Sequence, residues 1–327
     1  MTTRGNISQL DSIRGFAAVY VFLHHARLWP NSGFGSFLYL GQEAVILFFL
    51  LSGFVIYFST RVDPAKSPTV ATYLVHRFRR IYPIMSFALA LAFLGACIRE
   101  QAVVDLQLSN FVANLAMIQD VPSLKRGVWA ETYYGNTPLW SLSYEWWFYI
   151  LFIPLCLVKC VSPNRQGAIA FLLSAVGFVT YQMSPNASSL FASYFIIWWT
   201  GVELAREYVA SGAVSWTRQR STIVYLGVCS LLWAFPVAIA LHQQSPLRLG
   251  VDPVLQLRHF AAAFVVLIFG LIWYSRGLPF FRATLGPFRI FAPISYSLYL
   301  FHYPVLETLY AVGLARWPPG RTLDAPV

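Results

Sequence analysis

Residues 8–27 read SQLDSIRGFAAVYVFLHHAR and combine a long apolar run with ionisable side chains at both ends. Asp11 and Arg14 stand at the start, and His24 and His25 stand near the end. Arg14 and His25 are eleven residues apart, so on an α-helix they share a face to within about 20° and are separated by a rise of about 16 Å. We therefore predict that Arg14 marks one membrane surface and that His25 lies near the middle of a hydrocarbon core about 30 Å thick. Ionisable groups at that depth are costly and usually functional.

The composition around this stretch predicts a membrane protein. The chain has 327 residues, of which 57% are hydrophobic and only 11% are charged, whereas a soluble domain typically carries about 25% charged residues. Because lipid cannot satisfy backbone polar groups, long apolar segments must be helices. Nine segments are long enough to span: residues 12–29, 42–60, 81–98, 142–160, 167–183, 189–207, 222–241, 258–275 and 293–314. We predict an all-α, polytopic bundle of about nine to ten transmembrane helices in a single membrane-embedded domain, residues 1–327, in which small residues such as Gly53 allow close helix contact.

The distribution of basic residues predicts the orientation. With a cytoplasmic N-terminus, fifteen Lys and Arg residues fall on the inner side and eight on the outer side, in agreement with the positive-inside rule. The net charge of +10 is then explained by loops that face the anionic inner leaflet rather than by nucleic acid. We expect a multi-pass protein with its N-terminus in the cytoplasm.

Residues 76–83, HRFRRIYP, concentrate basic side chains where we expect the third helix to start. The members of this group are His76, Arg77, Arg79, Arg80 and Tyr82. They could anchor the helix at the cytoplasmic surface. They could also form a phosphate site, because arginine forks suit phosphate oxygens and helix N-terminal N–H groups add to the positive field. A nucleotide-bearing donor such as coenzyme A would need such a site.

Two further segments place polar groups among apolar residues. In residues 137–150, TPLWSLSYEWWFYI, Ser141 or Ser143 could cap a helix, and Glu145 follows just inside the outer surface. Glu145 either complements the helix dipole or orients a hydroxyl-bearing acceptor that enters from outside. In residues 294–304, ISYSLYLFHYP, His302 lies at about the predicted depth of His25 and is either structural or functional.

Together these segments resemble the acyltransferase-3 family of bacterial integral-membrane acyltransferases, which modify surface polysaccharides, nodulation factors and related glycans. Five motifs carry the similarity in the family's order and cover nearly the whole chain. They are LDSIRGFAAVYVFLHH (10–25), AVILFFLLSGFVI (44–56), RFRRIYP (77–83), PLWSLSYEWWFYI (138–150) and ISYSLYLFHYP (294–304). Ser12 replaces the family's usual glycine, and the family commonly has one further helix after the last motif, whereas this sequence stops at Val327.

The resemblance implies transfer of an acyl group, most often acetyl, from cytoplasmic acyl-CoA to a hydroxyl of a surface or secreted glycan or glycolipid at the bacterial inner membrane. It implies that Arg14 and His25 are essential and that Glu145 belongs to the catalytic set. By the same matching, the residues expected to bind donor or substrate are Arg77, Arg80, Asp11, Tyr82 and His302. We expect no metal and no permanently bound cofactor, since acyl-CoA enters as a co-substrate.

The chemistry assigns the first helix two tasks. A neutral imidazole among aliphatic residues can act as a general base, which we assign to His25, and Arg14 then holds the phosphate-bearing end of the donor. Whether the acyl group rests first on the enzyme, with Ser52 or His302 as relay, stays open. The competing hypothesis is a proton-coupled transporter or flippase, in which intramembrane His and Glu relay protons. In the outer connection, Trp129, Tyr133 and Tyr134 are compatible with stacking on sugars.

Overall fold

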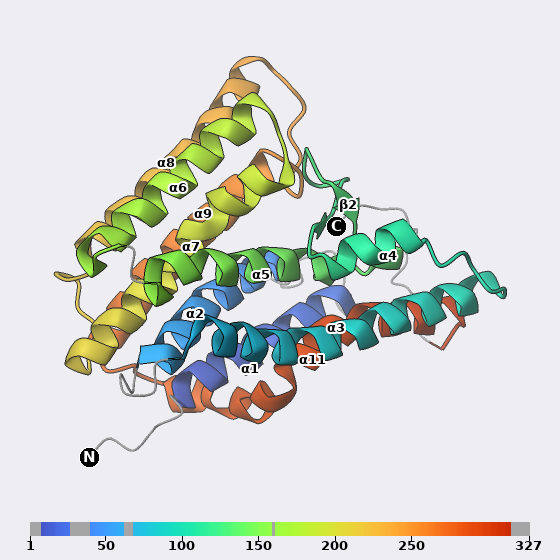
Figure 1. Ribbon diagram of the computed structural model, residues 1–327, viewed down its shortest axis with the longest axis horizontal. Coiled ribbons are helices and arrows are strands. Elements are labelled where there is room, and N and C mark those ends of the chain that lie inside the picture. Colours follow the sequence, from blue (N-terminus) through green and yellow to red (C-terminus); the bar gives the residue numbers. More distant parts are fainter. Residues whose placement is uncertain (1–7, 27–39, 62–67, 159–160, 315–327) are drawn as a thin grey trace.

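The computed structural model describes residues 8–26, 40–61, 68–158 and 161–314, which form a helical bundle with almost no strand (Figure 1). The long helices are α1 (Ser8–Ala26), α2 (Gly41–Arg61), α3 (Val70–Glu100), α5 (Trp140–Phe152), α6 (Pro163–Met183), α7 (Ala187–Ser211), α8 (Arg220–His242), α9 (Val254–Ser275) and α11 (Ser295–Ala311). The shorter elements are α4 (Leu108–Leu115), β1 (Gln119–Asp120), β2 (Ala130–Glu131), α10 (Phe281–Thr284), the 3-10 segments η3 (Tyr133–Gly135), η4 (Thr137–Leu139) and η6 (Gly286–Ile294), and the π-helical η5 (Ile153–Leu157).

Each of the nine predicted apolar segments coincides with a helix within the described residues. By length and composition, five of these helices could cross a membrane, namely α2, α3, α6, α8 and α9. The fold class, a helical membrane protein, is confirmed, whereas the number of spans and their direction stay predictions. The expectation about the C-terminal topology concerns residues 315–327, which lie outside the described residues.

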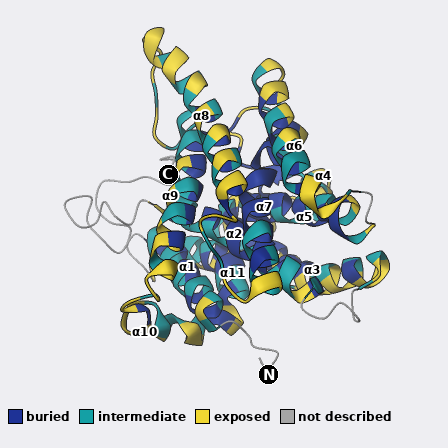
Figure 2. Cartoon of the chain, turned by 90° about the vertical axis from the view of Figure 1, so that its left-hand side faces the viewer, coloured by how far each residue is buried: buried dark blue, intermediate teal, exposed yellow. Residues whose placement is uncertain are grey.

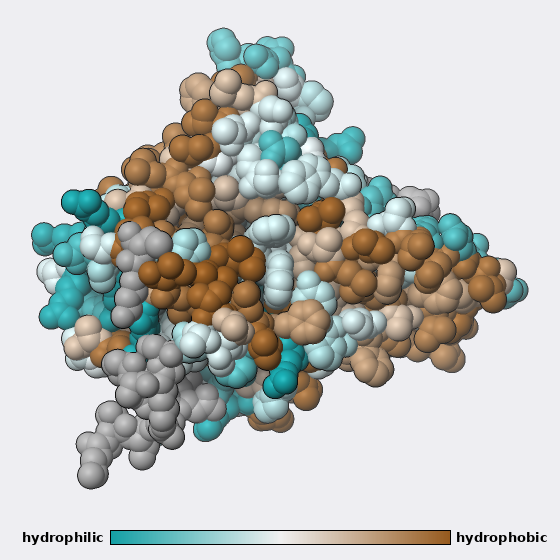
Figure 3. Space-filling view, in the orientation of Figure 1, coloured by the Kyte–Doolittle hydropathy of each residue, from teal (hydrophilic) through white to brown (hydrophobic). Residues whose placement is uncertain are grey.

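Helices α2 and α7 form the centre of the bundle. Helices α6, α8 and α9 lie on one side of them, and α1, α3 and α11 lie on the other, with α5 between the two groups (Figure 1). The central helices are largely buried, whereas the outward faces of α3 and α8 are exposed (Figure 2). Exposed apolar side chains such as Phe87, Leu94, Leu231 and Phe235 cover these faces, and broad apolar areas are visible on the surface in Figure 3. An apolar exterior is what a lipid environment requires.

The contact between α2 and α7 depends on two glycines. A Cβ atom on Gly53 would lie 2.0 Å from the backbone oxygen of Trp198, and one on Gly201 would lie 2.0 Å from that of Leu50. No larger side chain fits at either position unless the helices separate. The prediction that Gly53 permits close helix packing is confirmed, and it follows the general preference for small residues between membrane helices.

Helix α3 begins earlier than the apolar pattern indicated. Thr69 caps it by accepting a hydrogen bond from the backbone N–H of Thr72, so the helix starts at Val70 rather than near residue 81. At 31 residues it is about 46 Å long and exceeds the hydrocarbon thickness, so its polar first turns need no apolar residues. The HRFRRIYP motif therefore lies inside the helix, and the prediction that helix N-terminal N–H groups assist Arg77 and Arg80 is wrong.

The connection between α3 and α5 folds into a packed layer that includes the short helix α4. Strands β1 and β2 pair in parallel, with Gln119 opposite Ala130. Tyr133 is buried, and its hydroxyl donates to the carbonyl of Leu106 at 2.7 Å. Tyr133 is thus unavailable for stacking on a sugar, while Trp129 remains 53% exposed.

The predicted serine caps of α5 are also wrong. The 3-10 turn η4 leads directly into the helix, and no side chain caps it. The hydroxyl of Ser141 donates to Pro138 O at 3.3 Å, and that of Ser143 donates to Gln119 O at 2.8 Å. Both serines bond to carbonyls because the preceding helical turn already supplies the backbone contacts that a cap would make.

Candidate active site

Helix α1 packs along the segment formed by η6 and α11. A Cβ atom on Gly15 would lie 2.0 Å from Phe288 O, so the two backbones touch. Arg14 Nη2 donates to Asp11 Oδ1 at 3.0 Å and to Ala292 O at 3.3 Å. Farther along α1, a nitrogen of His25 contacts His302 at 3.1 Å. Arg14 and His25 thus face the same neighbouring segment, as their spacing predicted.

A cavity lies between α1, α2, α3, α5 and α11. Its charged and most polar lining residues are Asp11, Arg14, Ser52, Arg80 and Glu145. Along α2 the wall runs from Val45 to Ile56, which are eleven residues apart and separated by a rise of about 16 Å. The structure therefore brings together four of the predicted site residues, Asp11, Arg14, Arg80 and Glu145, in one elongated space.

Arg80 is the lining cation without an internal role. Its side chain is partly exposed, and within the described residues no hydrogen bond or ion pair engages its guanidinium, although the charge of Glu145 acts on it; Arg14, by contrast, is held by Asp11. An arginine offers five N–H donors in a fork that matches phosphate oxygens. Arg80 can give all of them to a ligand. Arg79, its exposed neighbour, is absent from the cavity wall.

The other two candidates on α3 lie outside the cavity. The guanidinium of Arg77 sits over the rings of Tyr73 and Tyr149, at 5.5 Å and 5.8 Å from their centroids. The hydroxyl of Tyr82 donates to Leu115 O at 3.0 Å, which ties α3 to α4. Arg77 supports the cavity wall from behind, and the structure places Tyr82 away from the other predicted site residues.

Glu145 lies deeper than predicted. Its Oε1 accepts a hydrogen bond from Ser52 Oγ at 2.6 Å and a short one from the Tyr149 hydroxyl, and Trp198 Nε1 donates to Ser52 at 3.2 Å. Ser52 is the twelfth of 21 residues in α2, so the carboxylate is at mid-helix depth and not at the outer entrance. Side chains from α2 and α5 hold this carboxylate, and α7 supports it through Ser52, whereas backbone N–H groups of a helix end do not contact it.

The histidine pair lies one aromatic ring beyond the cavity. Tyr299 closes the cavity wall, and its ring centroid is 6.2 Å from that of His302. The Tyr299 hydroxyl donates to Pro138 O at 3.0 Å and contacts Ser141 Oγ at 2.8 Å. His302 is in turn bonded to His25. The polar path from Arg14 to His25 is thus interrupted by a buried tyrosine.

Sequence reasoning missed the tyrosines of this site, although their spacing carried a signal. Tyr149 follows Glu145 by four residues, which places both on one face of α5. Tyr296, Tyr299 and His302 recur every three residues on α11, and the two tyrosines line the cavity. In an aromatic-rich chain this spacing was indistinguishable from packing.

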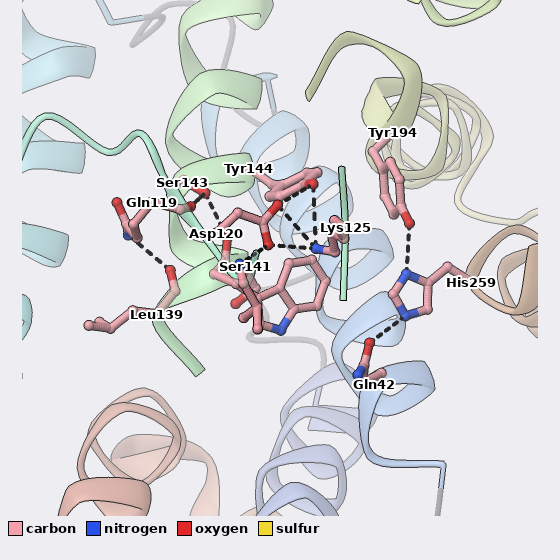
Figure 4. A network of polar contacts seen from close by, with 12 residues as sticks. Gln42, Gln119, Asp120, Lys125, Leu139, Ser141, Ser143, Tyr144, Tyr194 and His259 are labelled. Carbon is pink, nitrogen blue, oxygen red and sulfur yellow. Dashed lines mark hydrogen bonds and ion pairs between the residues drawn. The ribbon is translucent and has the colours of Figure 1, made fainter. Parts of the chain in front are cut away.

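A second polar cluster links the connection between α3 and α5 to the helical bundle (Figure 4). Buried Lys125 pairs with Asp120 at 2.9 Å, and its ammonium sits 3.6 Å from the centroid of the Trp140 ring. Burial lowers the pKa of Lys125, and the charge of Asp120 opposes that shift. The other face of the cluster is His259, which stacks on Trp140 with an interplanar angle of 4° and bonds to Tyr194 at 2.8 Å. No motif in the sequence indicated this cluster.

The fold and cavity define a helical membrane protein with an internal, partly charged binding space. A family model described as an acyltransferase domain matches residues 7–323. The chain therefore belongs to the acyltransferase-3 family.

Two relatives agree with this assignment. The chain is 31% identical over 201 residues to acyltransferase MdmB of Streptomyces mycarofaciens, an alignment that covers 56% of this chain and 49% of that protein. It thus spans about half the length of that curated relative. It is 26% identical to nodulation protein 10 of Rhizobium leguminosarum bv. viciae, with 96% of this chain and 87% of that protein covered. No solved structure matches the chain.

Proposed function

We propose that the protein transfers an acyl group, in the simplest case acetyl, from acyl-CoA to a hydroxyl of a glycan or glycolipid. Family membership supplies the reaction class. The observation that supports the donor is the uncommitted guanidinium of Arg80 beside Arg14 at one end of an elongated cavity. A donor with a phosphate-bearing head and a long thin arm matches this shape and charge, because guanidinium groups bind phosphate oxygens.

In the proposed reaction, the donor head contacts Arg80 and Arg14, and the arm lies along the α2 wall. Glu145 presents its carboxylate to amide N–H groups of the arm. The acceptor hydroxyl approaches from the histidine side. When the Tyr299 ring moves aside, His25 takes the proton of this hydroxyl while its oxygen attacks the thioester carbonyl. The C–O bond forms, the C–S bond breaks, and the imidazolium returns the proton to the departing thiolate. A positioned base of this kind typically contributes about 10²- to 10⁴-fold in rate.

The proposal includes an orientation. The Arg14 end of α1 faces the cytoplasm of a bacterial inner membrane, where acyl-CoA is available, and the His25 end faces the acceptor side. The distribution of fifteen inner against eight outer basic residues supports this direction. The protein then joins a cytoplasmic donor to an acceptor on the opposite side without moving either one completely across.

The test is transfer of radiolabelled acetyl from acetyl-CoA in membranes of cells that make the protein or lack it. We expect alkali-labile label on a glycan fraction with the wild type and none with His25→Ala, although that variant is inserted at the same level. His242→Ala, at the exposed end of α8, is the control and should transfer normally. Label that does not depend on the protein, or full transfer by His25→Ala, would overturn the proposal, and proton-coupled movement of a glycan without label would favour a transporter.

A further inference from the structure

We propose that His302 is a positioning residue that fixes His25 in the tautomer with its proton on Nδ1 and its lone pair on Nε2. This inference rests on the proposed function, because it assigns the base nitrogen of His25. It is carried by three hydrogen bonds that link the two imidazoles to each other and to their own helices.

The first step fixes the tautomer of His302. Its Nδ1 lies 2.9 Å from the carbonyl oxygen of Leu298, one turn back on α11. A carbonyl oxygen can only accept a hydrogen bond, so Nδ1 of His302 must carry the proton. In a neutral ring, Nε2 of His302 is then the unprotonated nitrogen and can only accept.

The second step transfers this constraint to His25. Nε2 of His302 lies 3.1 Å from Nδ1 of His25, and since the former accepts, the latter must donate. The same Nδ1 lies 3.0 Å from Val21 O, also an acceptor, so one N–H is shared between two acceptors. These two contacts of Nδ1 demand the same tautomer. The lone pair of neutral His25 is therefore on Nε2, the nitrogen that would take the acceptor's proton.

Packing holds the two rings in this arrangement. The His25 and His302 centroids are 4.9 Å apart, and Tyr303 meets the His25 ring edge-on at 5.3 Å. Phe22 meets the His302 ring edge-on at 6.3 Å, and His302 is 4% exposed. Rotation of either ring would break a backbone contact and displace these aromatic neighbours. The hydrogen bonds to the helix backbones and the aromatic contacts thus hold both rings in the same orientation.

The arrangement also serves the protonated state. When His25 gains a proton on Nε2, its Nδ1–H still donates to the neutral Nε2 of His302, so the imidazolium keeps a hydrogen-bond acceptor besides the backbone. A hydrogen bond from a charged donor is about twice as strong as a neutral one. The contact between the two rings is therefore stronger once the substrate proton has moved to His25.

The test separates tautomer from activity. In nitrogen-15 histidine-labelled protein in lipid nanodiscs, the His25 signals are assigned by their loss in His25→Gln. We expect wild-type His25 to show a protonated Nδ1 and an unprotonated Nε2. His302→Gln supplies an amide oxygen that can accept the same hydrogen bond, whereas His302→Leu, of similar bulk, cannot. In the leucine variant only the Val21 carbonyl still accepts from Nδ1, so the share of the tautomer protonated on Nε2 should rise above that of the wild type, whereas the glutamine variant should match the wild type.

Kinetics complete the test. We expect His302→Leu to lower kcat about 100-fold with an unchanged KM for acetyl-CoA, the lower part of the range for a positioned base. His302→Gln should recover most of that loss. A protonated Nε2 on wild-type His25, or equal kcat values in the two variants, would overturn the inference even if transfer is observed. If the wild type shows the expected tautomer but transfers no acyl group, the proposed function fails and the tautomer assignment stands.

Discussion

Replacing Arg80 by Gln should weaken donor binding without harming the fold. Arg80 lines the cavity, and within the described part of the chain no hydrogen bond or ion pair holds its guanidinium. A hydrogen bond to a charged group is worth about 1.5–3 kcal/mol. With about 1.4 kcal/mol for each factor of ten, the KM for acetyl-CoA should rise about 10- to 150-fold. Because this contact is equal in ground and transition states, kcat should change little.

Arg79→Gln is the matched control. Arg79 is the adjacent residue on α3, it is exposed, and it is absent from the cavity wall. Both variants remove one positive charge from the same turn of the same helix, so any effect of net charge on donor concentration near the membrane is equal. Only Arg80→Gln removes a guanidinium from the cavity. The melting temperatures of both variants should match that of the wild type.

The assay is the initial rate of thiol release against acetyl-CoA concentration, with purified protein in nanodiscs and saturating acceptor. The reasoning is refuted if the two variants have the same KM, because Arg80 would then be a surface anchor like Arg79. It is also refuted if Arg80→Gln lowers kcat at constant KM. That result would place the guanidinium near the reacting carbonyl instead of the donor's phosphates.

Three other substitutions test the cavity and its supports. Tyr299→Ala should open the cavity toward the histidine pair and raise thiol release in the absence of acceptor, while Tyr299→Phe keeps the ring and should not; equal rates for both would show that the ring is no barrier. Gly53→Ala should lower the free energy of unfolding by about 1–3 kcal/mol, because the added methyl group pushes α2 away from the backbone of Trp198 on α7. The melting temperature should fall, and an unchanged melting temperature would contradict the close contact. Lys125→Met should lower the free energy of unfolding by about 3–5 kcal/mol, because Asp120 stays buried without its partner. Adding Asp120→Asn should restore part of the lost stability. A double variant no more stable than Lys125→Met would show that the ion pair is unimportant.

The sequence predicted the parts of the fold that depend on local periodicity. Lipid forces apolar segments into helices, so segment positions alone located them. The shared face of Arg14 and His25 also followed from helix geometry, and both residues contact the η6–α11 segment. The role of Gly53 was predictable because few residues besides glycine allow two membrane helices to touch.

The depth of Glu145 was not predictable, because it depends on which helix α5 packs against. A carboxylate in the second turn of a membrane helix normally lies near the membrane surface. Here η4 and the connection between α3 and α5 position α5 so that Glu145 contacts Ser52 in the middle of α2. The start of α3 was missed because its first turns are polar and their helical state depends on the Thr69 cap. The pairing of Asp120 with Lys125, five residues apart in an irregular connection, follows neither the helix period nor the strand period.

Contacts between α1 and the η6–α11 segment fix the positions of Arg14 and His25, the residues proposed to bind the donor head and to act as the base. Arg14 contacts Ala292, and His25 contacts His302, so eleven residues on α1 match ten residues on the η6–α11 segment running in the same direction. On α1 the distance between the two residues is thus set by helical rise, about 1.5 Å per residue, and not by a loop that could change length. In the proposed function, a donor arm that reaches from Arg14 toward His25 must fit this interval and must also pass the ring of Tyr299.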